Sequence, residues 1–163
     1  MSRVFAYYTL VRMDEVTNAL YVGSIDDAGN QSRLAEHRIS VIISLTFAEP
    51  ETGFPPDVTV VRLPMMDGPQ NDHQTFVRAV NETLTRWEAE NRVLVHCSAG
   101  ASRSPAVAAT VVSLSTDQTL ESVFQQLKEE RAAVEPHEAL LRQAASVSNC
   151  GREYVEQAKR TRD

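Results

Sequence analysis

The stretch VLVHCSAGASRSPAVAATVV, residues 93–112, interrupts an apolar run with a short loop of small and polar residues. Its first part ends at His96 and is rich in apolar and β-branched side chains, which predicts a buried strand. The part that begins at Ser104 predicts a helix. Pro105 fits its first turn, because an N–H there would have no helical partner. The loop CSAGASR therefore joins the end of a buried strand to the start of a helix.

A loop in this position is suited to binding an anion. Unpaired N–H groups at a helix N-terminus and the helix dipole both favour negative charge. Gly100 permits backbone angles that other residues resist, and the neighbouring side chains are small enough to stay out of the way. Successive N–H groups can then surround a tetrahedral oxyanion. We predict a phosphate-binding loop made of Ser98, Ala99, Gly100, Ala101, Ser102 and Arg103.

Cys97 and Arg103 stand at the two ends of this loop. The helix dipole and the arginine both favour the thiolate form of the cysteine, which is a strong nucleophile toward phosphorus. The planar guanidinium of Arg103 can bind two phosphate oxygens at once, as a lysine could not. A lone cysteine is more often a buried apolar residue. The setting between a strand and a helix favours catalysis instead.

The rest of the chain alternates apolar segments with segments of helical spacing. Strands are predicted at residues 4–11, 20–22, 40–46, 58–63 and 92–96, and helices at residues 26–38, 72–91, 104–115, 119–134 and 135–159. Two of the strands are apolar on both faces, which indicates central strands covered on both sides. The predicted fold class is α/β: a single domain with a central, largely parallel sheet, helices on both faces and a mostly helical C-terminal half. Pro136 is expected in the first turn of the last helix.

The composition is that of a globular protein with one domain over residues 1–163. Of the 163 residues, 42% are hydrophobic and 23% are charged, and the 2 cysteines are too few for a disulfide framework. The net charge of −6 argues against general binding to nucleic acid, which requires many basic residues. No segment is apolar for long enough to cross a bilayer, and the first residues lack the features of a signal peptide. We therefore expect a cytoplasmic protein without nucleic-acid or membrane partners.

HCSAGASRS, residues 96–104, resembles the Cys-x5-Arg signature loop of the cysteine-dependent protein tyrosine phosphatase superfamily. Its His-Cys-x-x-Gly-x-Ser-Arg-Ser form is similar to the dual-specificity branch. The resemblance is clearest over residues 19–143. The family's strand, Gly-Ser turn, short helix and next strand are matched by LYVGSIDDAGNQSRLAEHRISVIISLT. Its general-acid loop is matched by VVRLPMMDGP, and its C-terminal helix pair is matched by LKEERAAVEPHEALLRQ. The resemblance implies a protein tyrosine phosphatase-like fold and hydrolysis of phosphate monoesters.

The resemblance also implies a role for each matching residue. Cys97 would be the nucleophile that forms a phosphocysteine intermediate, and Arg103 with the N–H groups of residues 98–103 would bind the phosphoryl oxygens. Ser104 would stabilise the cysteine thiolate as it leaves in the second step. His96 would order the loop through hydrogen bonds and help to keep the thiol ionised. Asp67 would act as general acid and then as general base. No metal or other cofactor is expected.

Several of these residues have a simpler interpretation. Asp67 lies in Asp-Gly-Pro, which is also a good turn sequence. Asp72 could compete for the acid role, although it is better suited to cap the helix that follows. Ser104 could be a plain helix N-cap. Arg131 either reaches toward substrate as a second anionic subsite or belongs to a solvated helix face.

Two further residues have no assigned role. His137 is most simply a surface residue, and it departs from the family, whose members usually carry Asn after the preceding proline. Cys150 is too distant in sequence to be assigned as a redox partner and is interpreted as a small residue in the last helix.

The expected substrate is a phosphorylated protein. A chain of this length leaves little room for the loops that deepen the pocket of phosphotyrosine-only enzymes, so phosphoserine and phosphothreonine are expected substrates alongside phosphotyrosine. The alternatives are a phosphoinositide or RNA 5′-triphosphate phosphatase of the same superfamily, or a catalytically inactive phosphate-binding module. Ser98 and Ala101 are neutral, whereas phosphoinositide enzymes tend to have lysine in this loop.

Overall fold

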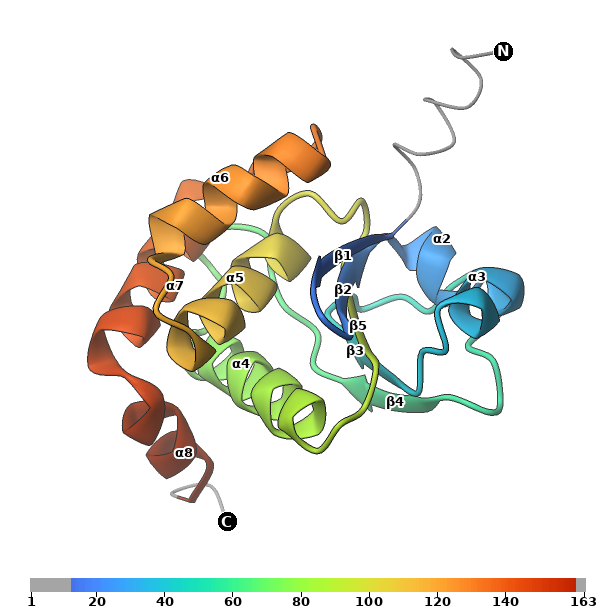
Figure 1. Cartoon of the computed structure of the whole chain (residues 1–163), viewed down its shortest axis with the longest axis horizontal. Coiled ribbons are helices and arrows are strands. Elements are labelled where there is room, and N and C mark those ends of the chain that lie inside the picture. Colours follow the sequence, from blue (N-terminus) through green and yellow to red (C-terminus); the bar gives the residue numbers. More distant parts are fainter. Residues whose placement is uncertain (1–12, 161–163) are drawn as a thin grey trace.

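A largely parallel sheet forms the centre of the computed structural model, which describes residues 13–160 (Figure 1). Within those residues the sheet has five strands in the order β1-β2-β5-β3-β4. They are β1 (Asp14–Thr17), β2 (Leu20–Gly23), β3 (Val41–Ser44), β4 (Thr59–Arg62) and β5 (Val93–His96). Strands β2, β5, β3 and β4 run parallel, and only β1 among the five is antiparallel to its neighbour. The predicted α/β class is confirmed.

Helices cover both faces of the sheet, as predicted. The short helices α2 (Ile25–Ala28) and α3 (Gln31–Glu36) lie on one face. On the other face, α4 (His73–Glu88) and α5 (Arg103–Ser115) pack against the strands. Three further helices pack on α4 and α5: α6 (Leu120–Glu130), α7 (Glu138–Cys150) and α8 (Arg152–Arg160) (Figure 1). Alternate residues of the central strands enter the two cores: Ile43 and Val95 face the large helical layer, whereas Ile42 and Leu94 face α2 and α3. All four are fully buried.

The strand predicted at residues 4–11 lies outside the described residues, and β1 was not predicted. The sequence of β1, DEVT, is short and half charged, so it has no apolar run to mark it. It lies at the edge of the sheet, where only one side of the strand needs a partner. An edge position accounts for the weak signal.

Three predicted helices are wrong in extent, and one of them, predicted over residues 119–134, already ends at Glu130 as α6. The helix predicted over residues 26–38 is two short helices, because the chain leaves the first at Gly29 and Asn30 caps the second through its side chain. The helix predicted over residues 135–159 breaks at Gly151, whose φ of 85° lies in the region that favours glycine. Its first half begins only at Glu138, so Pro136 precedes the helix and its cap, His137, and does not lie in the first turn.

The remaining long helices follow the predicted apolar stripes. Phe76, Val77, Val80 and Leu84 of α4 are buried, and Trp87 packs against the same core from the helix end. Asp72 occupies the N-cap position of α4, as its sequence context suggested. Among the described residues no helix combines the length and hydrophobicity needed to cross a bilayer.

Candidate active site

Cys97 follows β5 at the carboxyl end of the parallel strands and is only 2% exposed. Its N–H donates to the carbonyl of Gly23 at 3.3 Å, and the N–H of Ile25 donates to the carbonyl of Ser98 at 3.1 Å. The loop is thus held against the turn that follows β2. Gly100 has a φ of 70°, and a Cβ at this position would lie 2.8 Å from the backbone of Gly23. Only glycine fits there, as the sequence suggested.

The sulfur of Cys97 lies at the N-terminus of α5. The N–H of Ser104 donates to Sγ at 3.4 Å, and the Ser104 hydroxyl lies 3.3 Å from the same atom. Both side chains are buried. The interpretation of Ser104 as a plain N-cap is wrong, because Ser102 occupies the N-cap position and Ser104 lies inside the first turn. The hydroxyl of Ser104 is therefore directed at the thiol.

The Arg103 guanidinium reaches back to the first residues of the loop. Its Nη1 donates to the carbonyls of Met65 at 3.0 Å and Leu45 at 3.3 Å, and its Nη2 donates to the hydroxyl of Ser98 at 3.0 Å. The two carbonyls lie just beyond the ends of β4 and β3, respectively. The guanidinium is therefore oriented by backbone groups at the carboxyl end of the parallel strands, where Cys97 also lies.

His96 is the last residue of β5, is fully buried and lies beside Ser44 of β3. Its Nε2 lies 2.7 Å from the Ser44 hydroxyl, and its Nδ1 lies 3.2 Å from the carbonyl of Cys97. Burial, assisted by the charges of Arg103 and Arg62, lowers the pKa of His96 to about 4, although the hydrogen bond to Cys97 opposes this. The ring is therefore neutral at pH 7. Because a carbonyl can only accept, Nδ1 carries the proton and Nε2 accepts from Ser44.

Asp67 contacts the loop directly and is otherwise exposed. Its Oδ1 accepts a hydrogen bond from the Ser102 hydroxyl at 2.5 Å. The same Ser102 oxygen accepts from the N–H of His137 at 2.8 Å. Asp72, the competing candidate, instead accepts from the Thr75 hydroxyl in the first turn of α4. Asp67 is the aspartate that the structure brings to the loop.

The Ser102 and Ser98 side chains do more than stay out of the way, which corrects the sequence interpretation. Ser102 joins three segments: the loop, the segment after β4 and the start of α7. Ser98 accepts from Arg103. Their small size was visible in the sequence, but the partners of their hydroxyls come from distant segments and left no local signal.

Arg131 is buried beneath the loop, with 2% of its surface exposed. It donates from Nε to the carbonyl of Gly100 and from Nη2 to the carbonyl of Ala99, both at 3.0 Å. Its Nη1 donates to Asp14 at 2.8 Å. The solvated-face interpretation is wrong. The guanidinium is also bound to the loop and to Asp14 instead of being presented to a second anion.

The contacts of Arg131 orient two N–H groups of the loop. In a trans peptide the carbonyl and the following N–H point in opposite directions. Drawing the carbonyls of Ala99 and Gly100 toward Arg131 therefore turns the N–H groups of Gly100 and Ala101 away from it. Burial raises the pKa of Asp14, and the hydrogen bond and charge of Arg131 oppose that rise. The ion pair ties the edge strand β1 to this support.

Cys150 is the last residue of α7 and is an exposed free thiol, whereas Cys97 is a buried one. Over residues 13–160 no three side chains of His, Cys, Asp or Glu are grouped so that they could hold a metal ion. Taken together, the described residues define an α/β protein with a candidate anion site between a parallel strand and a helix. A buried thiol and a guanidinium stand at the two ends of that site.

The chain belongs to the family described as dual specificity phosphatase, catalytic domain, whose model matches residues 20–150. It is 28% identical over 133 residues to the protein phosphatase Slingshot homolog of Xenopus laevis, covering 81% of this chain and 19% of that protein. It is 28% identical to the putative tyrosine phosphatase 123R of Invertebrate iridescent virus 6, covering 80% of this chain and 88% of that protein. The chain spans about a fifth of the length of the Slingshot homolog and of the worm phosphatase vhp-1.

Solved structures agree with this assignment at the level of the fold. The crystal structure of DUSP15 matches with a TM-score of 0.80 and 24% identity, covering 92% of this chain and 96% of that one. A single-residue variant of human DUSP28 matches with a TM-score of 0.76 and 25% identity, covering 85% of this chain and 95% of that one. The fold predicted from the signature loop is thereby confirmed.

Proposed function

We propose that this protein is a dual-specificity protein phosphatase that hydrolyses phosphotyrosine, phosphoserine and phosphothreonine monoesters through a phosphocysteine intermediate. The observation that carries the proposal is the position of the Cys97 sulfur at the N-terminus of α5, 3.4 Å from the N–H and 3.3 Å from the hydroxyl of Ser104. A buried cysteine with a merely apolar role would need no such donors. Membership of the phosphatase family supports the same interpretation.

In the first step the Cys97 thiolate attacks phosphorus. A sulfur–phosphorus bond forms as the bond from phosphorus to the substrate oxygen breaks. Asp67, positioned by Ser102, gives its proton to that leaving oxygen. The N–H groups of residues 98–103 and the guanidinium of Arg103 stabilise the charge on the transferring phosphoryl oxygens.

In the second step water hydrolyses the phosphocysteine. Asp67, now a carboxylate, takes a proton from the attacking water as the new phosphorus–oxygen bond forms. The sulfur–phosphorus bond breaks and leaves the electron pair on Cys97. The Ser104 hydroxyl donates a hydrogen bond to that thiolate. Inorganic phosphate leaves, and the chemistry balances without a metal or other cofactor.

His96 supports both steps without touching the substrate. It is neutral at pH 7, so it acts through its hydrogen bonds and not through charge. Its Nδ1–H fixes the carbonyl of Cys97, and Ser44 fixes its Nε2. We therefore assign it a positioning role that keeps the cysteine backbone in place at the end of β5.

The proposed partner is a phosphorylated protein. Neutral Ser98 and Ala101 in the loop offer no extra cation for the additional phosphates of a phosphoinositide. The net charge of −6 is unfavourable for an RNA substrate. An inactive binding module would not need Cys97, Arg103 and Asp67 together. A cytoplasmic location without nucleic-acid or membrane partners stays a prediction from the sequence.

A parallel assay tests the proposal. The purified chain is given phosphotyrosine, phosphoserine and phosphothreonine peptides, a phosphoinositide panel and RNA with a 5′-triphosphate, and phosphate release is measured. We expect hydrolysis of the phosphopeptides. Hydrolysis of phosphoinositides or RNA alone would replace the proposed substrate class. Binding of phosphopeptides without any turnover would favour the binding module.

A further inference from the structure

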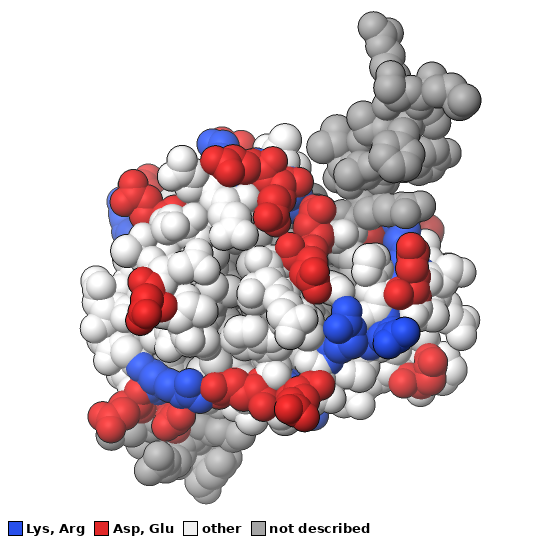
Figure 2. Space-filling model, viewed as in Figure 1, with Lys and Arg blue, Asp and Glu red and all other residues white. Residues whose placement is uncertain are grey.

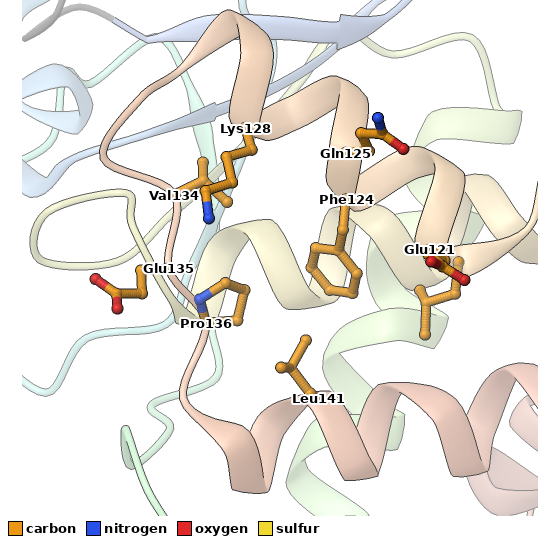
Figure 3. Close-up of a pocket in the computed structure, with 9 residues that line it drawn as sticks. Glu121, Phe124, Gln125, Lys128, Val134, Glu135, Pro136 and Leu141 are labelled. Atoms are coloured by element: carbon orange, nitrogen blue, oxygen red, sulfur yellow. The ribbon is translucent and has the colours of Figure 1, made fainter.

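A groove of about 610 Å³ opens between α6 and α7. Phe124 of α6 and Leu141 of α7 point toward one another across it (Figure 3). Val134 and Pro136, from the segment that joins the two helices, form one end of the lining. Leu141 is 36% exposed, and large apolar residues with that much exposure are few among the described residues. The groove can therefore accommodate an apolar side chain of another molecule.

The border of the groove is mainly acidic. Glu121 and Glu135 line it, and Lys128 is the one basic residue in its lining. Figure 2 shows both acidic and basic side chains around a largely uncharged surface on this face of the molecule. The charge pattern suits a partner that has basic residues close to an apolar one.

One end of the groove rests on the signature loop. The N–H of Glu135 donates to the carbonyl of Ala101, and the N–H of His137 donates to the hydroxyl of Ser102, both at 2.8 Å. The segment of residues 131–137 thus supports the loop on one side and lines the groove on the other. To reach the groove, a peptide bound at the loop would cross this segment, and each extended residue would advance it by about 3.3 Å.

We propose that the groove binds the segment of the phosphoprotein substrate next to the phosphorylated residue. A large apolar side chain of the substrate lies between Phe124 and Leu141, and a basic side chain lies near Glu121. The inference rests on the proposed function and adds a sequence preference to it. A second copy of this chain suits the groove less well, because its net charge of −6 would meet a border that is already acidic.

The test uses phosphopeptides matched in everything but their flanks. A leucine and an arginine are moved through successive positions on either side of the phosphorylated residue, in a background of alanine and glycine. We expect one register to raise kcat/KM about tenfold, which is the size of effect that partial burial of a leucine side chain gives. Two variants probe the groove: Leu141→Glu and Glu121→Gln. Each has a control on the same helix outside the groove lining, Ser146→Glu and Glu129→Gln, respectively.

Leu141→Glu should abolish the preference for leucine, and Glu121→Gln should weaken the preference for arginine. The two controls should keep both preferences. All four variants should hydrolyse para-nitrophenyl phosphate at rates within about twofold of the parent, because this small substrate does not reach the groove.

Several outcomes would overturn the inference. One is that the parent shows no register preference, and another is that Leu141→Glu slows para-nitrophenyl phosphate as much as the best peptide. A dimer in light scattering that Leu141→Glu dissociates would assign the groove to a second copy. Failure to hydrolyse any phosphopeptide is a different result, since it would reject the proposed function itself.

Discussion

The burial of His96 makes the stability of the fold depend on pH in a defined direction. The pKa of the ring falls from 6.5 to about 4 in the folded protein, chiefly because burial disfavours its charged form. Between these values the unfolded chain binds more protons than the folded one, so stability is lost as pH falls from about 6.5 to about 4. Each pKa unit is worth about 1.4 kcal/mol, so the full loss is on the order of 3 kcal/mol.

The assay is urea denaturation at a series of pH values for the parent and for His96→Asn, which removes the titrating group. Other groups titrate in the same range, but their contributions cancel when the two curves are subtracted. The parent should lose about 3 kcal/mol more than the variant on acidification. Stability curves that stay parallel from pH 7 to pH 4 would refute the reasoning. If the variant does not fold, the NMR signal of the His96 ring in the parent gives its folded pKa directly.

Three other changes have expected outcomes. Asp67→Ala should slow kcat for alkyl phosphates by about a hundredfold or more while affecting para-nitrophenyl phosphate much less, since only poor leaving groups need a proton; if Asp72→Ala does this instead, the acid is misassigned. Ser104→Ala should slow the second step, so that rapid mixing with para-nitrophenyl phosphate shows a larger burst of product before the steady state; an unchanged burst would remove Ser104 from that step. Arg131→Met should lower the free energy of unfolding, measured with urea, by about 3 kcal/mol or more. The substitution leaves a partly buried carboxylate and two carbonyls without their partner. A loss below about 1 kcal/mol would contradict the role of Arg131 in holding the loop.

The strand, loop and helix around Cys97 could be predicted because they are local. Apolar spacing marks β5 and α5, and the small residues between them leave few interpretations other than an anion loop. The alternation of predicted strands and helices supplied the α/β class, and the signature pattern supplied the phosphatase-like fold. The edge strand β1 was missed because an edge strand can be short and polar, and its importance comes from Asp14, which meets a residue far along the chain.

The contacts that shape the loop could not be read from the sequence. Arg131 follows a run of charged residues at the end of α6, so the sequence left two interpretations open: a solvated helix face and a second anionic subsite. Its burial results from the way α6 ends against the loop, which is a tertiary effect. Ser102 and Asp67 are 35 residues apart, and their hydrogen bond depends on how the segment after β4 returns to the loop. Patterns within one segment carry no information on such pairs.

The most direct test of the account is to trap the phosphorylated enzyme. The chain is mixed with para-nitrophenyl phosphate, quenched in acid within the first turnovers and digested for mass spectrometry. We predict phosphate on the peptide that contains Cys97, loss of turnover in Cys97→Ser, and no change in Cys150→Ser, which alters the exposed thiol instead. Turnover that survives in Cys97→Ser, or phosphate trapped on another residue, would contradict the central claim.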